Sequence, residues 1–219
     1  MSFSKSKTSK KRIREIINIK KTFYLMRHGQ TLFNLRRKIQ GASDSPLTEL
    51  GIEQAKIAGE YLKDIDFDHY YSSTAERASD TLELAVGHDI EYTRLKGLKE
   101  MNFGIFEGES EDLNPTWENG YDDVFPKVGG EYRDEVRDRM KETCIEIMEK
   151  EDHHTVLAAS HSGASFHFMR NWVDADGVKK VFDEGGFPNG CIAKYTYEDG
   201  EFEFIEMIRP DLSRLETLI

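Results

Sequence analysis

The chain has 219 residues, of which 38% are hydrophobic, so it is long enough for one domain with a sizeable core. Its formal net charge is −11, and its two cysteines, Cys144 and Cys191, lie far apart and outside any Cys-x-x-Cys pattern. This composition excludes a disulfide-rich secreted scaffold and argues against zinc or redox chemistry at thiols, so we expect a cytoplasmic protein with reduced cysteines. No continuous apolar stretch has the length of a secretory signal or a membrane span, and we expect no membrane partner.

The first 21 residues differ in charge from the rest of the chain. Residues 1–21 hold eight Lys or Arg and one acid, Glu15, whereas residues 22–219 hold 22 bases and 40 acids. A basic extension of this kind can bind nucleic acid or an anionic membrane. The alternative, which we favour over nucleic acid, is a solvated extension or a short helix that docks on the acidic body. We predict a basic N-terminal extension over 1–21 and a single domain over 22–219.

The first strong structural signal is the apolar run at residues 23–26, which ends in Arg27, His28 and Gly29. A short apolar run that empties into polar residues and glycine is typical of a buried parallel strand with a loop at its carboxyl end, where α/β sheets place their ligands. An imidazole can attack phosphorus, a guanidinium can hold two phosphate oxygens, and glycine lets the backbone approach an anion. Taken alone, the tripeptide is better explained by an Arg-His pair at the end of a strand that binds nearby carboxylates.

Short strands and helical stretches alternate over the remainder of the chain, which predicts a sheet covered by helices on both faces. Thr48 is a plausible cap for the first long helix. The predicted helices cover residues 48–63, 75–86, 131–150 and 163–173. An apolar strand at 155–159 empties into Ser160 and His161, repeating the layout of the first strand. Strands at 191–197 and 202–208 flank a turn and read as a hairpin at the edge of the sheet.

Five motifs follow one another in a fixed order along this pattern. They are residues 23–31, 40–51, 70–81, 98–108 and 155–163. Together they resemble the histidine phosphatase superfamily, on its phosphoglycerate mutase-like branch, over about residues 22–208. The resemblance implies a three-layer α/β/α sandwich with a mainly parallel sheet.

The resemblance also implies a role for particular residues. His28 resembles the nucleophile that becomes phosphohistidine, and Glu100 resembles the proton donor and acceptor. The rest of the phosphate pocket is then formed by Arg27, Arg77 and His161, with weaker matches at the substrate-contacting positions Asn34, Gln40 and Gly41. Two guanidinium groups and a second imidazole would surround the oxygens of the transferring phosphoryl group, so this chemistry needs no metal and no cofactor. Repulsion from the phosphate would keep Glu100 protonated until it donates to the leaving group.

Three of these assignments have a simple competitor. Arg77 could form a surface salt bridge with Glu76 or Asp80, which lie near it on the same predicted helix. Glu107 competes with Glu100 for the acid role because both lie in one loop, although the resemblance favours Glu100. His161 could be a core histidine with its hydrogen bonds satisfied.

Two further groups of histidines are assigned no chemistry. His153 and His154 lack a partner at the sequence spacing of metal ligands, and we interpret them as a solvated turn. His167 lies in an apolar helix, where packing is the expected role.

Residues 109–130 combine Trp117, Tyr121 and Phe125 with six acids and one base, Lys127. The resemblance places a substrate-covering lid here. The alternative is an acidic surface loop whose aromatic side chains pack inward.

The acidic character of this segment bears on the reaction. A phosphoglycerate mutase needs extra Lys or Arg to hold a substrate carboxylate, so we predict a phosphatase that hydrolyses a small phosphomonoester with a neutral or apolar remainder. Arg36, Arg37 and Lys38 would weaken this prediction if they pointed into the pocket. The alternatives are mutase-type phosphoryl transfer and a non-catalytic phosphate-binding regulatory protein. The sequence leaves the physiological substrate and the oligomeric state open.

Overall fold

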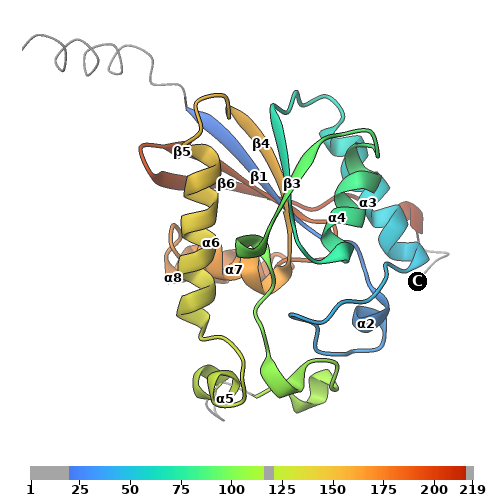
Figure 1. Ribbon diagram of the computed structural model, residues 1–219. Helices are drawn as coiled ribbons and strands as arrows, with labels where there is room; N and C mark the ends of the chain where they lie inside the picture. Colours follow the sequence, from blue (N-terminus) through green and yellow to red (C-terminus); the bar gives the residue numbers. More distant parts are fainter. Residues whose placement is uncertain (1–19, 116–120, 216–219) are drawn as a thin grey trace, which may run out of the picture.

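A computed structural model describes residues 20–115 and 121–215. It contains a six-stranded sheet with the order β3-β2-β4-β1-β5-β6 (Figure 1). The strands are β1 (Lys21–Arg27), β2 (His69–Ser73), β3 (Tyr92–Leu95), β4 (Thr155–Ser160), β5 (Ile192–Glu198) and β6 (Glu201–Ile208). The first four are parallel, and β5 and β6 are antiparallel to their neighbours. The mainly parallel sheet predicted from the sequence is confirmed.

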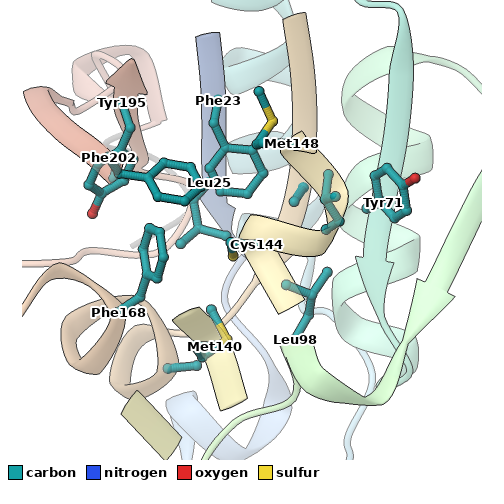
Figure 2. Packing of buried hydrophobic residues seen from close by; sticks show 14 of the residues in the cluster. Phe23, Leu25, Tyr71, Leu98, Met140, Cys144, Met148, Phe168, Tyr195 and Phe202 are labelled. Atoms are coloured by element: carbon teal, nitrogen blue, oxygen red, sulfur yellow. The ribbon is translucent and has the colours of Figure 1, made fainter. Parts of the chain in front are cut away.

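The two faces of the sheet are covered by different helices, as the alternation of side chains along β1 requires. Phe23 and Leu25 pack into a cluster with α6 (Arg133–Met148) and α7 (Ser162–Met169) (Figure 2). Tyr24 and Met26 face the opposite cluster, with α3 (Glu49–Leu62) and α4 (Glu76–Val86). Each such buried side chain contributes about 1.5–3 kcal/mol. The three-layer sandwich is therefore confirmed.

Most predicted helices form near their expected bounds. The side chain of Thr48 accepts a hydrogen bond from the Gly51 N–H and caps α3. The helix predicted over 163–173 is wrong at its end, because α7 stops at Met169 and Asp174 caps a further helix, α8 (Ala175–Asp183). The sequence prediction also lacks the short helices α2 (Leu32–Leu35) and α5 (Tyr121–Lys127) and the 3-10 turns η1 (Lys96–Leu98), η2 (Gly104–Phe106), η3 (Glu111–Leu113) and η5 (Ser213–Leu215). None of the helices in the described part of the chain is long and apolar enough to cross a membrane.

The hairpin predicted at the edge of the sheet is present. Asp199 and Gly200 join β5 to β6 with φ values of 49° and 88°, which is the twist that a tight two-residue hairpin turn requires. Gly200 adopts this conformation without strain. β6 is the last strand on its side of the sheet, as expected.

The arrangement of β1 and β4 fixes where the site lies. In this parallel pair Arg27 lies opposite Ser160, so His28 and His161 leave the sheet side by side. The segments around α2 and α5 lie beyond the same end of the sheet (Figure 1). At the other end Lys21 begins β1, one residue before the predicted domain boundary, and Lys20 forms an exposed ion pair with Glu203. The remainder of the basic extension lies outside the described residues.

Candidate active site

His28 follows β1 directly and is almost fully buried, with 3% of its surface exposed. Its ring Nδ1 lies 2.8 Å from the Gly29 carbonyl oxygen, so that nitrogen carries the proton and donates it. Nε2 makes no hydrogen bond to any described residue and keeps its lone pair. Burial, followed by the positive charges of Arg77 and Arg27, holds the pKa of His28 well below its usual value. The ring is therefore neutral at physiological pH and presents Nε2 as a nucleophile.

Gly29 makes the turn behind this histidine. A Cβ atom at this position would lie 2.3 Å from the carbonyl oxygen of Gly51 in α3. The Gly29 N–H donates to the Thr81 hydroxyl in α4 at 3.0 Å. Because Gly29 has no side chain, the loop can pack directly against α3 and α4.

His161 is fully buried after β4, and its ring centroid lies 5.2 Å from that of His28. Its Nε2 lies 2.8 Å from the Ser73 hydroxyl at the end of β2, whereas its buried Nδ1 has no partner. If the hydroxyl donates to Nε2, the ring proton lies on Nδ1 and is available to a ligand. His161 is therefore not a core histidine with both nitrogens satisfied.

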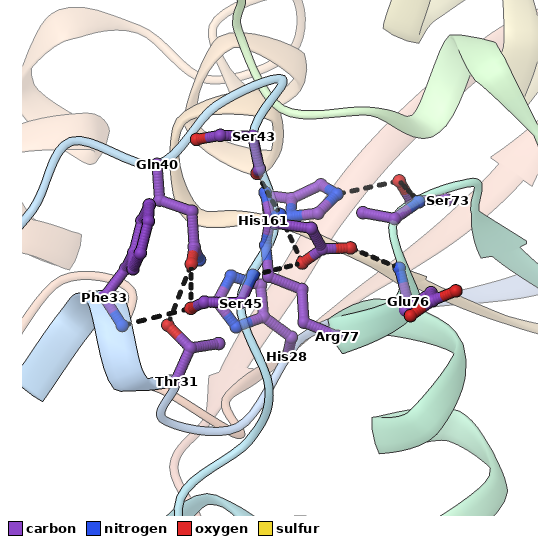
Figure 3. Close-up of polar contacts among 12 residues, drawn as sticks. His28, Thr31, Phe33, Gln40, Ser43, Ser45, Ser73, Glu76, Arg77 and His161 are labelled. Atoms are coloured by element: carbon purple, nitrogen blue, oxygen red, sulfur yellow. Dashed lines mark hydrogen bonds and ion pairs between the residues drawn. The ribbon is translucent and has the colours of Figure 1, made fainter. Parts of the chain in front are cut away.

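Arg77 lies in the first turn of α4 and is completely buried. Its Nη1 donates to the Ser43 carbonyl at 2.8 Å and to the Asp44 carboxylate at 2.9 Å, and its Nη2 donates to the Gly41 carbonyl at 3.0 Å. The surface salt bridge with Glu76 or Asp80 does not form. Figure 3 shows Arg77 grouped with the rings of His28 and His161, with Ser73 beyond His161.

Four buried donors around His28 lack a partner among the described residues. They are Arg27 Nε, Gln40 Nε2, Arg77 Nε and His161 Nδ1. A buried donor left unpaired costs about 1–3 kcal/mol, so four unpaired donors from separate segments need an explanation. An anion with several oxygens satisfies such donors at once, and a phosphate group fits them.

Glu100 contacts the segment that follows His161 and is 7% exposed. One carboxylate oxygen accepts from the N–H groups of Met101 and Ala164 at 2.8 and 2.7 Å, and the other accepts from Gly163 at 2.8 Å. The last two donors belong to the first turn of α7, immediately after His161. The side chain is thus held in one orientation against the start of α7, directly after His161 in the chain.

Glu107, the competing acid, has a different environment. Its carboxylate accepts from the N–H groups of Gly41, Ala42, Ser43 and Phe103, and from the Ser43 hydroxyl. Burial alone would raise its pKa, but the Ser43 hydroxyl and the backbone donors outweigh burial and lower the pKa. Glu107 is therefore a stable anion that shapes the 41–43 loop.

The 41–44 loop is held between opposite charges. Its N–H groups point to Glu107, whereas its carbonyl groups at Gly41 and Ser43 point to Arg77. A Cβ atom at Gly41 would lie 1.9 Å from the Met101 carbonyl oxygen. Both backbone groups of Gly41 are thus engaged within the protein.

The other predicted substrate-contacting residues differ in what they offer. Asn34 uses its Oδ1 to accept from the Thr31 N–H, which caps α2, and from Asn189. The carbonyl oxygen of Gln40 accepts from the hydroxyls of Thr31 and Ser45, which leaves its amide nitrogen as one of the unpaired donors. Of these three residues, Gln40 offers the clearest unpaired group, its amide nitrogen.

Arg139 of α6 was not among the site residues predicted from the sequence. It donates to the carbonyl groups of Gly97, Lys99 and Glu100 at 2.7–3.0 Å and forms a two-point contact with Glu131. This guanidinium fixes the backbone that carries Glu100. An Arg in an amphipathic helix gives no sequence signal of such a role, because its partners lie about 40 residues away.

The described part of the 109–130 segment bears on the lid hypothesis. Phe125 is fully buried and packs edge-on against Phe103 and Phe106, so this aromatic residue packs inward. Trp117 lies outside the described residues.

The exposed side chain of Arg37 forms an ion pair with Asp112 at 2.7 Å and so points toward the acids of this segment. A cavity of about 260 Å³ lies beside Glu100, lined by Ala42, Lys96, Lys99, Glu100, Asn102, Glu131 and Arg139.

Comparison with known proteins agrees with this geometry. The chain matches the histidine phosphatase superfamily (branch 1) over residues 23–209 and belongs to that family. The resemblance seen in the five motifs is confirmed.

Similar proteins differ in their named activities. The chain is 31% identical to "Uncharacterized phosphatase PhoE" of Bacillus subtilis over 80% of this chain and 88% of the relative. It is 34% identical to "Probable phosphoglycerate mutase GpmB" of Salmonella choleraesuis over 63% and 68% of the two chains. It is 29% identical to "Fructose-2,6-bisphosphatase TIGAR B" of Danio rerio over 72% of this chain, and the match spans 65% of that relative's length. A solved phosphoglycerate mutase from Bacillus anthracis superposes with a TM-score of 0.75 at 28% identity, over 88% and 95% of the chains.

Proposed function

We propose that this chain is a phosphatase that hydrolyses a small phosphomonoester through a phosphohistidine intermediate at His28. The observation that carries the proposal is the set of four unpaired buried donors beside a neutral imidazole whose Nε2 is free. Nε2 attacks phosphorus, and the bond between phosphorus and the ester oxygen breaks. A water molecule then attacks the phosphohistidine and releases inorganic phosphate, which restores the neutral ring.

Glu100 supplies and recovers the proton in this scheme. A phosphate dianion beside the carboxyl group favours its protonated form, and this form donates to the departing alkoxide. The resulting carboxylate then accepts a proton from the attacking water. The three N–H groups that hold Glu100 support the second state, because they stabilise its negative charge.

The remaining donors stabilise the transferring phosphoryl group. Arg27, Arg77 and His161 face its oxygens, and Gln40 adds an amide N–H. Arg77 also holds the 41–44 loop, so binding and loop position are linked through one side chain.

Hydrolysis is favoured over mutase transfer by the acids of the 109–115 segment and by the pairing of Arg37 with them. A substrate with a neutral or apolar remainder fits this surface. The second candidate is mutase-type transfer or hydrolysis of an anionic substrate. It is supported by Lys96 and Lys99, which line the cavity beside Glu100, and by the similarity to GpmB. A purely phosphate-binding role is the weakest alternative, since every residue that the chemistry uses is present.

The test is an assay on a generic aryl phosphate in excess chelator. We expect turnover by the wild type, no turnover by His28→Ala, and a loss of about 10²-fold or more in kcat for Glu100→Gln. His88→Ala, an exposed histidine, is the matched control and should be unaffected. Acid-quenched protein should carry phosphate at His28 during turnover. Full activity of His28→Ala would rule out the proposal.

The same preparation separates the two reactions. Incubation with 3-phosphoglycerate and its bisphosphate should yield inorganic phosphate as the main product. Interconversion of phosphoglycerates at a rate matching hydrolysis would favour the mutase.

A further inference from the structure

The end of the sheet opposite the active site carries a second group of histidines. His69 is the first residue of β2, and Asp152 and His153 lie in the turn before β4. Because β2 and β4 are parallel neighbours, with His69 opposite Val156, these residues meet at the amino ends of the strands. His28 and His161 follow the carboxyl ends of β1 and β4, at the opposite end of the sheet.

One carboxylate joins the two imidazoles. Asp152 Oδ2 lies 2.9 Å from His69 Nε2, and Asp152 Oδ1 lies 2.9 Å from His153 Nδ1. The three ligand atoms lie within 4.8 Å of one another. We propose that His69, Asp152 and His153 bind a divalent transition-metal ion of the Zn²⁺ type, remote from the phosphate pocket. Two imidazole nitrogens and one carboxylate oxygen form the donor set that such ions prefer, with water in the open position.

The ring of His153 is supported as a ligand would be. Its side chain is 4% exposed, and its Nε2 lies 2.7 Å from the Tyr71 hydroxyl, which Lys150 also contacts at 2.7 Å. Ligating histidines typically make such a hydrogen bond through the second nitrogen, which orients the ring.

The other two residues leave the site accessible. The side chains of His69 and Asp152 are 36% and 72% exposed. The rings of His69 and His153 are stacked, with centroids 3.7 Å apart and planes 15° from parallel. An ion in the plane of His153 therefore lies out of the plane of His69, and binding requires the exposed His69 ring to rotate toward it. The positive charge of Lys150 lies beyond Tyr71, on the far side of the His153 ring from the carboxylate.

The test uses the full chain, stripped of metal with chelator and then titrated with zinc chloride in a calorimeter. We expect one Zn²⁺ per chain in the wild type, and an affinity reduced by about tenfold or more in His69→Gln and Asp152→Asn. Both substitutions change exposed side chains, so the fold should persist. His88→Gln is the matched control, because His88 also contacts a carboxylate, Glu83, but has no second imidazole beside it in the described part of the chain.

A His28→Ala variant distinguishes this site from the phosphate pocket. Zinc binding should survive in His28→Ala, and its loss there would assign the ion to the active site and overturn the proposal. Absence of zinc binding in the wild type, or equal affinity in the wild type, His69→Gln and Asp152→Asn, would also overturn it. The proposal is independent of the proposed function, because its readout is binding and not turnover.

Discussion

At the scale of single residues, a backbone carbonyl determines which ring nitrogen of the proposed nucleophile, His28, is free. Because the Gly29 carbonyl accepts from Nδ1 of His28, the lone pair is left on Nε2. Burial contributes most to the lowered pKa that keeps this ring neutral, and the positive charges of Arg77 and Arg27 lower the pKa further. A histidine that packs only against apolar groups would have neither a fixed tautomer nor a phosphate-binding neighbour.

Gly163 determines the position of Glu100. A Cβ atom at residue 163 would lie 2.7 Å from Glu100 Oε1, so Gly163→Ala should push the carboxyl group away from the pocket. We expect kcat on an aryl phosphate to fall by about tenfold to a hundredfold, with little change in KM. Alanine is favoured over glycine inside a helix, so thermal stability should be largely kept.

The control for this prediction is a double-mutant cycle with Glu100→Gln. If Gly163 acts through Glu100, adding Gly163→Ala to Glu100→Gln should lower kcat little further. Additive losses in the double variant would show that Gly163 acts by another route.

Glu107 is predicted to be structural. Glu107→Gln brings an amide group against a ring of N–H donors, and we expect a loss of about 2–3 kcal/mol in the free energy of unfolding. Because the pKa of Glu107 is lowered on folding, its stabilising effect is complete above about pH 4.5 and fades as pH falls through the folded value. Urea denaturation of both proteins at several pH values measures this difference. A difference that grows below pH 4.5 would contradict the assignment.

The sequence alone indicated the groups that we propose to act directly on phosphate, because phosphate chemistry dictates their residue types. It did not find the residues that hold them. Ser73 and Asp44 lie inside two of the five motifs. Their contacts with His161 and Arg77 nevertheless depend on strands and loops that only the folded chain brings together. The partner of His153 was missed for the same reason, since His69 is 84 residues away in the sequence.

At the scale of elements, α6 links the core to the site. Its apolar side packs on the sheet, while Arg139 reaches the carbonyl groups of the segment that carries Glu100. Packing of the helix thus determines the position of Glu100, the proposed proton donor.

Replacing this guanidinium should loosen the Glu100 segment. In Arg139→Met we expect kcat to fall about tenfold, with KM changed less, and stability to fall by about 2 kcal/mol because Glu131 loses its guanidinium partner and keeps only the Asn102 N–H. The matched control is Arg137→Met on the same helix, where the exposed carboxylates of Asp134 and Asp138 are the partners. Equal losses in the two variants would point to a general effect on α6.

The elements themselves were predictable where periodicity was strong. The apolar strands β1 and β4 and the amphipathic helices α3, α4 and α6 form near their expected bounds. The break between α7 and α8 was missed because the apolar residues Trp172 and Val173 continue the pattern through the turn. Asp174, which caps α8 by accepting from the Gly177 N–H, was the available signal.

At the scale of the whole molecule, the parallel strands separate two groups of histidines. One lies at the carboxyl ends with the arginines, and the other lies at the amino ends with Asp152. Helices on both faces bury the strands, so a packed core lies between the two ends of the sheet. The proposed phosphate chemistry and the proposed metal binding can therefore be tested separately.

Burial of neutral histidines should make the stability of the whole molecule depend on pH. Burial, with nearby arginines, lowers the pKa values of His28 and His161 and lowers that of His167 to about 3. Below about pH 6.5 the unfolded chain binds protons that the folded chain does not, so the free energy of unfolding falls by about 1.4 kcal/mol per pH unit for each such group. This stability is complete above the unfolded pKa and is lost as pH falls toward the folded value.

His167 provides the test, because it lies outside the phosphate pocket. In His167→Gln, urea denaturation between about pH 6 and pH 4 should show a pH dependence shallower by about 1.4 kcal/mol per unit than in the wild type. The exposed substitution His88→Gln should leave the slope of the wild type largely intact. An unchanged slope in His167→Gln would mean that His167 accepts a proton in the folded state. The packing of His167 beside Arg170 would then have to loosen as pH falls. His167 Nδ1 lies 3.3 Å from Arg170 Nη1, and two positive charges at that distance need water around them.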